Sequence, residues 1–250
     1  MLRPEIFRLA KAGSRRTEYE DSVAWSHRWA RLAVADGASA SAFARLWAHL
    51  LVHAYTAGWL EAETLETDVG RIQGRWATRV DQRPLAWYAA EQARRGAFAA
   101  LVGFSLMKDG RWNALAVGDC CLFQVRGDAL LVAFPLGHPD AFDNRPLLLC
   151  SRPAGNASLR RGGAIVTATG GWEPGDTFML MSDALAAAFL RLLFGALAEV
   201  EPNPSPWDVL QFDRTRAGFR RWIQTLRAHR VLRNDDVSLA LLHVPHAAVT

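Results

Sequence analysis

The residues best suited to chemistry in this chain are carboxylates that stand at the ends of short apolar runs. The clearest run, Leu32 to Ala35, ends in Asp36 and Gly37. Such a run is typical of a buried strand that delivers an acid at its tip, and the glycine lets the backbone approach whatever the acid holds. Similar acidic positions recur at Glu20, Asp21, Asp119, Asp183, Asp235 and Asp236.

Carboxylates gathered at one end of a fold repel one another and lose hydration unless cations neutralise them. Oxygen ligands of this kind suit hard ions such as Mg²⁺ or Mn²⁺. Two such ions about 3.5–4 Å apart can activate water and clamp a phosphoryl group. The alternative is that each aspartate serves only its own strand-ending turn. The residues by themselves leave the shared metal site and the independent turns equally open.

The apolar patterns indicate which elements must position these acids. Helical spacing predicts long helices over residues 40–60 and 85–102, with residues 61–82 as the end of the first helix and a connection. A later helix is expected over 185–197, and one or two more over 207–230. Because helices and strands do not alternate regularly, the order predicts an α+β fold with packed sheets and outer helices. The expected strands are 5–10, 22–25, 29–35, 103–108, 112–117, 121–126, 129–134, 147–151, 164–168, 177–182 and 237–244.

Composition narrows the class of protein. Half of the 250 residues are hydrophobic, which suits one domain with a substantial core. The formal net charge is +4, and arginine supplies almost all of the positive charge, since Lys11 and Lys108 are the only lysines. The arginines are scattered, which argues against nucleic-acid binding. No secretory leader, membrane span, disulfide framework or zinc pattern is indicated, so we expect a soluble, cytoplasmic protein.

Five short segments that contain these acids follow one another along the chain. They are Gly13-x-x-Arg16-x-x-Tyr19-Glu20-Asp21-Ser22, Val34-Ala35-Asp36-Gly37, Val117-Gly118-Asp119, Pro174-Gly175-Asp176 with Met181-Ser182-Asp183-Ala184-Leu185, and Asn234-Asp235-Asp236-Val237-Ser238. In this order they resemble motifs of the PP2C-like (PPM) family of metal-dependent serine/threonine protein phosphatases. Each motif alone is short, but five in order with compatible spacing are specific. The resemblance implies a single PP2C-like domain over residues 1–250, built as a four-layer αββα sandwich of two antiparallel sheets flanked by helices.

The resemblance also implies how the acids would bind metal. Asp36 would bridge two Mg²⁺ or Mn²⁺ ions, and the carbonyl of Gly37 would bind one of them. The other implied positions are Asp183 and Asp235 on the first ion, Glu20 mostly through water with Asp21 on the second, and Asp119 with Asp183 on a third, weaker ion.

The activity implied is direct hydrolysis of phosphoserine and phosphothreonine by metal-activated water, without a protein nucleophile. Arg16 and Asp36 are the candidate catalytic residues, because the planar fork of Arg16 suits a phosphate oxygen pair. The implied partners are a phosphorylated protein substrate and an opposing serine/threonine kinase, with no membrane or nucleic-acid partner. The compact size and the arginine bias favour a bacterial origin.

The chain departs from the family pattern in places that bear on turnover. Tyr19 replaces a small polar residue, and Ser39-Ala40 replaces a flexible Gly-Gly pair. Ala184 replaces a glycine, which would cost about 1 kcal/mol if this position required positive φ. All candidate acids are retained, which favours an active enzyme.

Two alternatives remain open beside the protein phosphatase. The first is a catalytically weak or inactive phosphatase-fold sensor or scaffold that binds a phosphoprotein. The second is a hydrolase of a small phosphorylated molecule. A basic helical surface is also expected, either solvated or docking an acidic phosphoprotein, at Arg214, Arg216, Arg220, Arg221 and Arg227.

Overall fold

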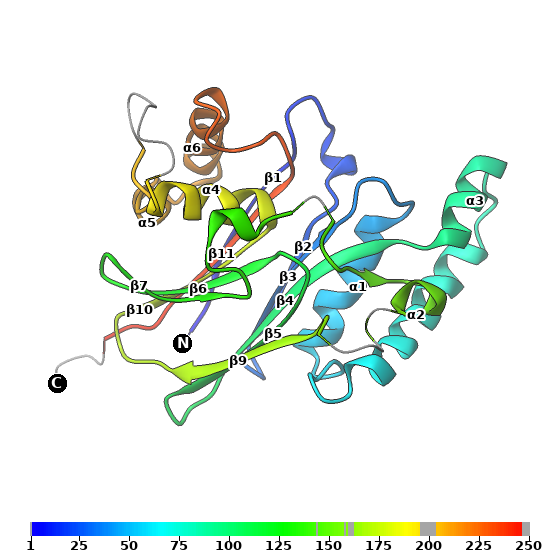
Figure 1. Ribbon diagram of the computed structural model, residues 1–250, viewed down its shortest axis with the longest axis horizontal. Helices are drawn as coiled ribbons and strands as arrows, with labels where there is room; N and C mark the ends of the chain where they lie inside the picture. The colour runs from blue at the N-terminus through cyan, green and yellow to red at the C-terminus, as the bar shows by residue number, and fades with distance from the viewer. Residues whose placement is uncertain (1, 144, 158, 160–162, 196–203, 247–250) are drawn as a thin grey trace.

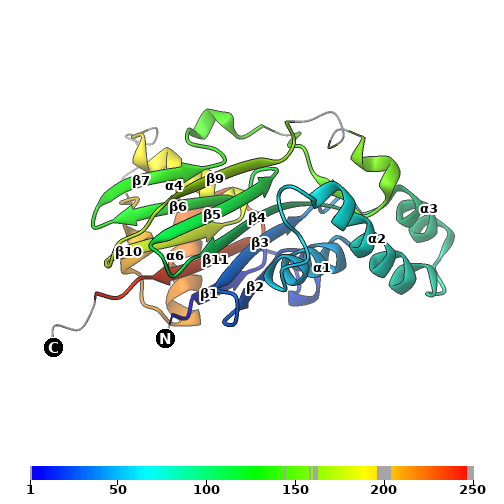
Figure 2. The same cartoon turned by 90° about the horizontal axis from the view of Figure 1, so that it is seen from below.

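The computed structural model describes residues 2–143, 145–157, 159, 163–195 and 204–246. Its framework is two antiparallel sheets packed face to face (Figures 1 and 2). The first sheet has the order β1 (Glu5–Leu9), β11 (Val237–His243), β10 (Asp176–Met181), β6 (Cys121–Arg126) and β7 (Ala129–Phe134). The second has the order β2 (Ser22–Ser26), β3 (Arg31–Gly37), β4 (Phe98–Leu106), β5 (Arg111–Val117) and β9 (Val166–Gly171), and β8 (Leu149–Cys150) pairs with β4.

Helices cover the outer face of each sheet, which confirms the predicted four-layer sandwich. The second sheet carries α1 (Ala44–Thr56) and, further out, α2 (Leu65–Asp81) and α3 (Trp87–Arg95) (Figure 1). The first sheet carries α4 (Asp183–Leu193), α5 (Asp208–Gln211) and α6 (Arg216–Ala228). Short 3₁₀ turns lie at η1 (Arg16–Glu18), η2 (Pro139–Ala141) and η3 (Pro153–Asn156).

The core has three apolar clusters, one for each contact between layers. The cluster between the sheets contains Phe104, Trp112 and Phe178, whose rings lie 4.5–6.2 Å apart. Trp112 also donates its indole N–H to Gln124 Oε1 at 3.0 Å, so this buried polar group is satisfied. The inter-sheet contact therefore fixes how the two sheets, and the acids at their ends, lie relative to each other.

The sequence prediction was wrong over residues 61–106 in two ways. Residues 65–81 form a separate helix, α2, whose buried positions recur at helical spacing on an otherwise polar segment. The helix expected over 85–102 ends at Arg95, because Gly96 adopts φ +90° and the chain then enters β4 at Phe98. Strand β4 is buried on both faces, so its continuous apolar run resembles a buried helix.

The other expected elements are confirmed, with ends that move by a few residues. The segment expected as one or two helices over 207–230 forms α5 and α6, and the strand expected over 164–168 begins and ends later, as β9. The last two residues of the helix expected over 185–197 lie outside the described residues, and α4 ends at Leu193.

Gly118, between β5 and Asp119, permits a backbone conformation that no other residue fits here. Its φ is +93°, and a Cβ atom would lie 2.7 Å from the Cβ of Ala100 and 3.1 Å from the carbonyl oxygen of Leu147. We expect Gly118→Ala to lower the free energy of unfolding by about 2–4 kcal/mol in urea denaturation. Gly110→Ala is the matched control, because Gly110 has φ +83° and a Cβ atom there would meet nothing closer than the carbonyl oxygen of Trp172 at 4.0 Å. It should cost only about 1 kcal/mol. Equal losses in the two variants would contradict this account.

The turn before β10 is held by the carboxylate of Asp176, which is fully buried. It accepts hydrogen bonds from Arg126 Nε at 2.6 Å, Gln124 Nε2 at 2.8 Å and the backbone N–H of Glu173 at 2.9 Å. Burial opposes ionisation, but these donors together hold the pKa of Asp176 below its usual value.

Because the pKa of Asp176 is lower folded than unfolded, its stabilising effect is present above the unfolded pKa and is lost as pH falls through the folded one. We expect Asp176→Asn to lower the free energy of unfolding near neutral pH by about 2 kcal/mol. Denaturation of both proteins across acidic pH tests this, since the difference should shrink toward the acid end. If the difference in free energy of unfolding between the two proteins does not change with pH, the loss comes from altered packing or hydrogen bonding and not from the charge of Asp176.

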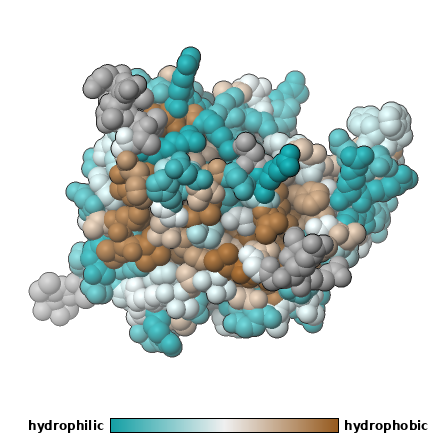
Figure 3. All heavy atoms as spheres, in the orientation of Figure 1, coloured by the Kyte–Doolittle hydropathy of each residue, from teal (hydrophilic) through white to brown (hydrophobic). Residues whose placement is uncertain are grey.

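The surface seen in Figure 3 is hydrophilic at the α3 end and hydrophobic over β7, the edge strand of the first sheet. Leu131 of β7 is 46% exposed. Within the described residues, no helix is long and apolar enough to cross a lipid bilayer.

Candidate metal and phosphate site

The strand register brings the candidate acids to one end of the sandwich. In the second sheet Ala35 pairs with Ser22, so Asp36 at the end of β3 lies near Asp21 before β2. In the first sheet Met181 pairs with both Cys121 and Leu239. The turn that holds Asp119, the start of α4 at Asp183 and the loop before β11 with Asp235 therefore share that end.

The electrostatics of Asp36 show that these acids are neighbours. Burial raises the pKa of Asp36 well above its usual value, and the negative charges of Asp21, Asp119 and Asp235 raise it further. Carboxylates from both sheets and from separate turns are therefore close enough to Asp36 for their charges to oppose its ionisation. Isolated turn residues would not raise one another's pKa, so these acids are treated together as one candidate site.

Asp21 is a buried acid, 4% exposed, whose oxygens make no well-formed hydrogen bond within the described residues. Burial, followed by the charge of Asp236, raises its pKa to about 7, although the nearby hydroxyls of Ser238 and Ser182 act to lower it. A buried carboxylate with both oxygens unpaired is costly, and a divalent cation beside it would remove that cost. The groups near Asp36 that could bind a metal ion are carboxylates, the ligand type that Mg²⁺ and Mn²⁺ prefer. The residues present therefore fit such ions.

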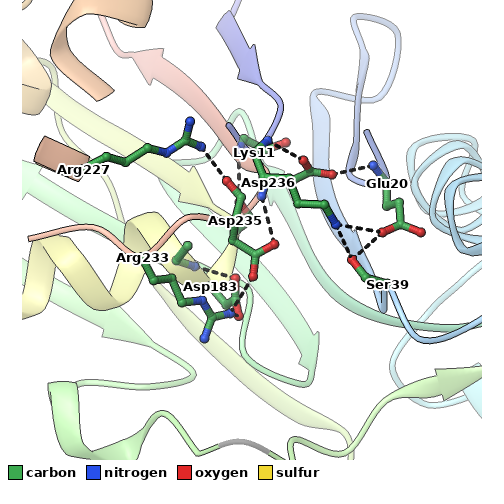
Figure 4. A network of polar contacts seen from close by, with 11 residues as sticks. Lys11, Glu20, Ser39, Asp183, Arg227, Arg233, Asp235 and Asp236 are labelled. Atoms are coloured by element: carbon green, nitrogen blue, oxygen red, sulfur yellow. Dashed lines mark hydrogen bonds and ion pairs between the residues drawn. The ribbon is translucent and has the colours of Figure 1, made fainter. Parts of the chain in front are cut away.

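A second group of contacts joins Asp183 and Asp235 through Arg233 (Figure 4). Arg233 Nη2 donates to Asp183 Oδ2 and lies 3.3 Å from Asp235 Oδ2. Asp183 begins α4, and its Oδ1 accepts from the backbone N–H of Ala184. The guanidinium therefore neutralises both acids implied for the first metal ion. Nothing in the sequence pattern distinguished Arg233 from the other scattered arginines.

A third group of contacts holds Glu20 in place (Figure 4). The buried carboxylate of Asp236 accepts from the backbone N–H groups of Lys11 at 2.9 Å and of Glu20 at 2.7 Å. Ser39 donates to Glu20 Oε2, and Lys11 Nζ lies 3.8 Å from the same oxygen. Burial raises the pKa of Glu20. Asp236 thus ties both ends of the loop over residues 11–20 to the strand β11, a positioning role that its sequence position did not reveal.

Gly37 has the close backbone approach expected from its type. A Cβ atom there would lie 2.9 Å from the carbonyl oxygen of Glu20 and 3.0 Å from the backbone of Ala44. The end of β3 can therefore lie directly against Glu20 only with glycine at this position.

The departures from the family pattern have local structural explanations. Ala184 lies inside α4, and among the described non-glycine residues positive φ occurs only at Ala30, Phe43 and Arg230, so Ala184 causes no backbone strain. The hydroxyl of Tyr19 contacts Ser238 Oγ at 2.5 Å, joining its loop to β11. Ser39 binds Glu20, so the Ser39-Ala40 pair adds a contact where glycines would give flexibility.

The side chains of these acids do not by themselves form a complete set of metal ligands. Within the described residues, no three His, Cys, Asp or Glu side chains converge closely enough to hold a metal ion. Asp21, Asp36, Asp119 and Asp235 are electrostatic neighbours, and Asp183 joins Asp235 through Arg233. Arg16 lies in η1, near the start of β2, and its side chain falls outside what the structure describes.

Comparison with known proteins gives a consistent result. A family model described as protein phosphatase 2C matches residues 11–238. The fold is similar to the serine/threonine phosphatase PstP/Ppp of Mycobacterium tuberculosis, with a TM-score of 0.62, 17% identity and coverage of 98% of this chain and 99% of that chain. The catalytic domain of PstP in complex with two manganese ions matches with a TM-score of 0.60, 17% identity and coverage of 98% and 99%. PppA, a regulatory component of the type VI secretion system in Pseudomonas aeruginosa, matches with a TM-score of 0.55, 18% identity and coverage of 97% of each chain. No curated protein matches the chain.

Proposed function

The chain belongs to the protein phosphatase 2C family, and on that premise we propose that it is a metal-dependent serine/threonine protein phosphatase. The observation that carries the proposal is the group of carboxylates around Asp36, to which both sheets contribute and in which Asp21 has no hydrogen-bond partner within the described chain. A fold that kept only its architecture would have no physical reason to retain this repulsive arrangement. We further propose that residues 1–250 form one phosphatase domain, that the protein is cytoplasmic and bacterial, and that its substrate is a phosphoprotein made by a serine/threonine kinase.

The carboxylates of these residues and the carbonyl of Gly37 would hold two Mg²⁺ or Mn²⁺ ions and a third ion that binds more weakly. Asp36 would be shared by two ions, beside the carbonyl of Gly37. When bound, such ions supply Lewis-acid activation of water and neutralise charge on the phosphoryl group. The remaining ligands would be Asp183 and Asp235 for the first ion, Glu20 through water with Asp21 for the second, and Asp119 with Asp183 for the third.

The other residues of the proposed site would bind the substrate phosphate or position the metal ligands. Arg16 would bind two phosphate oxygens with its planar fork and keep the phosphoryl group in line with the attacking water. Asp236 positions Glu20 by accepting its backbone N–H, and Ser39 orients the Glu20 carboxylate. Cys120 and Cys121 are poorly suited to act as nucleophiles, because both are buried and burial raises the pKa of each thiol.

The test is hydrolysis of a phosphothreonine peptide, p-nitrophenyl phosphate and a small sugar phosphate, each with Mn²⁺ and with EDTA. We expect Mn²⁺-dependent turnover of the peptide with a higher kcat/KM than of the sugar phosphate. A preference for the sugar phosphate would favour a small-molecule hydrolase.

One observation favours the sensor or scaffold alternative. Arg233 already neutralises Asp183 and Asp235, so these acids need no cation for stability. A folded protein that binds a phosphopeptide but hydrolyses none of the three substrates with Mn²⁺ would establish that alternative.

A further inference from the structure

A large cleft runs along the edge of the sandwich where both sheets end. Its volume is about 1600 Å³, and its floor is formed by the nine consecutive residues 6–14 of β1 and the loop that follows. Figure 2 shows β1 and β2 between α6 and α1, which supply the walls of the cleft. Small-molecule pockets usually enclose about 300–1,000 Å³, so this cleft is better suited to a segment of another chain.

The charge of the cleft is strongly positive. Asp21 is the only acidic residue among the described residues that line it. Within the described chain, Lys11 is the only basic lining residue in an ion pair, with Glu20 at 3.8 Å, although the charges of Asp236 and Asp235 also act on Arg227. The remaining like charges repel one another, and an anionic ligand would relieve that repulsion. The basic residues that line the cleft are Arg8, Lys11, Arg45, Arg83, Arg216, Arg220 and Arg227.

His49, on the α1 wall, lies within reach of several of these charges. Burial lowers its pKa most, and the charges of His53, Arg79, Arg45 and Arg8 lower it further. The side of the cleft formed by α1 therefore has a positive field even apart from α6.

The floor of the cleft offers a backbone as well as charge. Because consecutive residues of β1 line it, the cleft borders the edge of the strand and not only one of its faces. β1 is the terminal strand of its sheet and pairs with β11 on one side only within the described chain. An extended peptide can add to such an edge through main-chain hydrogen bonds.

We propose that this cleft docks an extended acidic segment of the phosphoprotein substrate. The cleft also reaches Tyr19 and Asp21, so a docked segment would lead toward the acids around Asp36. The occupant is named as substrate on the basis of the proposed function, whereas the acidic chemistry rests on the cleft alone.

The aromatic residues of the cleft favour a peptide over a nucleic acid. Binding of single-stranded nucleic acid depends on aromatic faces that are free to stack on bases. Phe7 and Phe219 are buried and stack on each other at 5.3 Å, and Arg83 lies over the ring of Phe43 at 5.3 Å. These contacts use one face of each of the three phenylalanine rings, which leaves less aromatic surface for bases to stack on.

The first experiment measures binding without catalysis. A fluorescein-labelled peptide of alternating Glu and Gly, with no phosphate, is titrated with the full chain in EDTA and followed by anisotropy. We expect the double charge reversal Arg216→Glu with Arg220→Glu to weaken binding at least about tenfold, and added salt to weaken wild-type binding. The matched control is Arg28→Glu with Arg71→Glu, which changes the net charge equally at exposed residues outside the cleft and should bind within about twofold of wild type.

The second experiment links the cleft to the substrate. With Mn²⁺, Arg216→Glu with Arg220→Glu should leave p-nitrophenyl phosphate turnover unchanged and raise KM for a phosphothreonine peptide with an acidic flank. Equal loss of binding in the control pair, or tighter binding of a single-stranded oligonucleotide in the same cleft, would overturn the proposal. If no substrate is turned over but the peptide still binds through Arg216 and Arg220, the proposed function fails while the acidic docking site remains.

Discussion

Asp36→Asn is expected to abolish Mn²⁺-dependent hydrolysis and, in the same protein, to raise the melting temperature measured in EDTA. The loss of kcat should be at least about 10³-fold, because the variant loses the one carboxylate that both metal ions would share. The gain in stability follows from the raised pKa of Asp36. Its charge is disfavoured by burial and by Asp21, Asp119 and Asp235, and asparagine has no such charge.

The two readouts of Asp36→Asn exclude a trivial explanation, since a misfolded variant would lose both activity and stability. The measurements are p-nitrophenyl phosphate turnover with Mn²⁺ and thermal denaturation in EDTA near neutral pH. Asp109→Asn is the control, because Asp109 is exposed in the turn between β4 and β5 and pairs only with Arg111 among the described residues. It should leave turnover unchanged. Retained Mn²⁺-dependent turnover in Asp36→Asn would contradict the assigned site.

Arg233→Ala is expected to have opposite effects on metal binding and on metal-free stability. Without metal, Arg233 neutralises Asp183 and Asp235, so its removal should lower the melting temperature in EDTA. With metal, the same acids are needed as ligands, and a competing guanidinium must release them. We therefore expect the variant to bind Mn²⁺ on the order of tenfold more tightly by calorimetric titration.

Two controls define what Arg233 contributes. Arg233→Lys keeps the charge and should stay nearer to wild type in both readouts, because a single nitrogen of Arg233, Nη2, makes both contacts. Arg71→Ala removes an exposed arginine from α2 and should change neither. Weaker Mn²⁺ binding by Arg233→Ala would mean that Arg233 organises the two acids for the ion instead of competing with it.

The elements that carry the acids could be predicted from the sequence because each ends a short, strongly apolar strand. β3 and β10 have this pattern, and their ends hold Asp36 and Asp183 as expected. The segment from α2 to β4 could not be predicted in the same way. The buried face of α2 is narrow within a polar segment, and β4 is buried on both faces, so its periodicity does not separate strand from helix.

The supporting residues of the site were harder to foresee than the acids themselves. Asp236 looks in sequence like one more candidate ligand, but its buried carboxylate is used by the backbone N–H groups of Lys11 and Glu20. Arg233 is one arginine among many until the loop before β11 places it between Asp183 and Asp235. The partners of Asp236 lie more than 200 positions away in the sequence, and Asp183 lies 50 positions from Arg233. No local sequence pattern encodes contacts over such separations.

The central claim is that carboxylates from both sheets form one metal site around Asp36. The most direct measurement is a crystal structure of the Mn²⁺-soaked protein with anomalous scattering recorded at the manganese edge. We expect two anomalous peaks about 3.5–4 Å apart, both within ligand distance of Asp36, with Arg233 displaced from Asp183 or Asp235. Peaks bound elsewhere, or an ordered protein with no peak and Arg233 still bridging the two acids, would contradict the account.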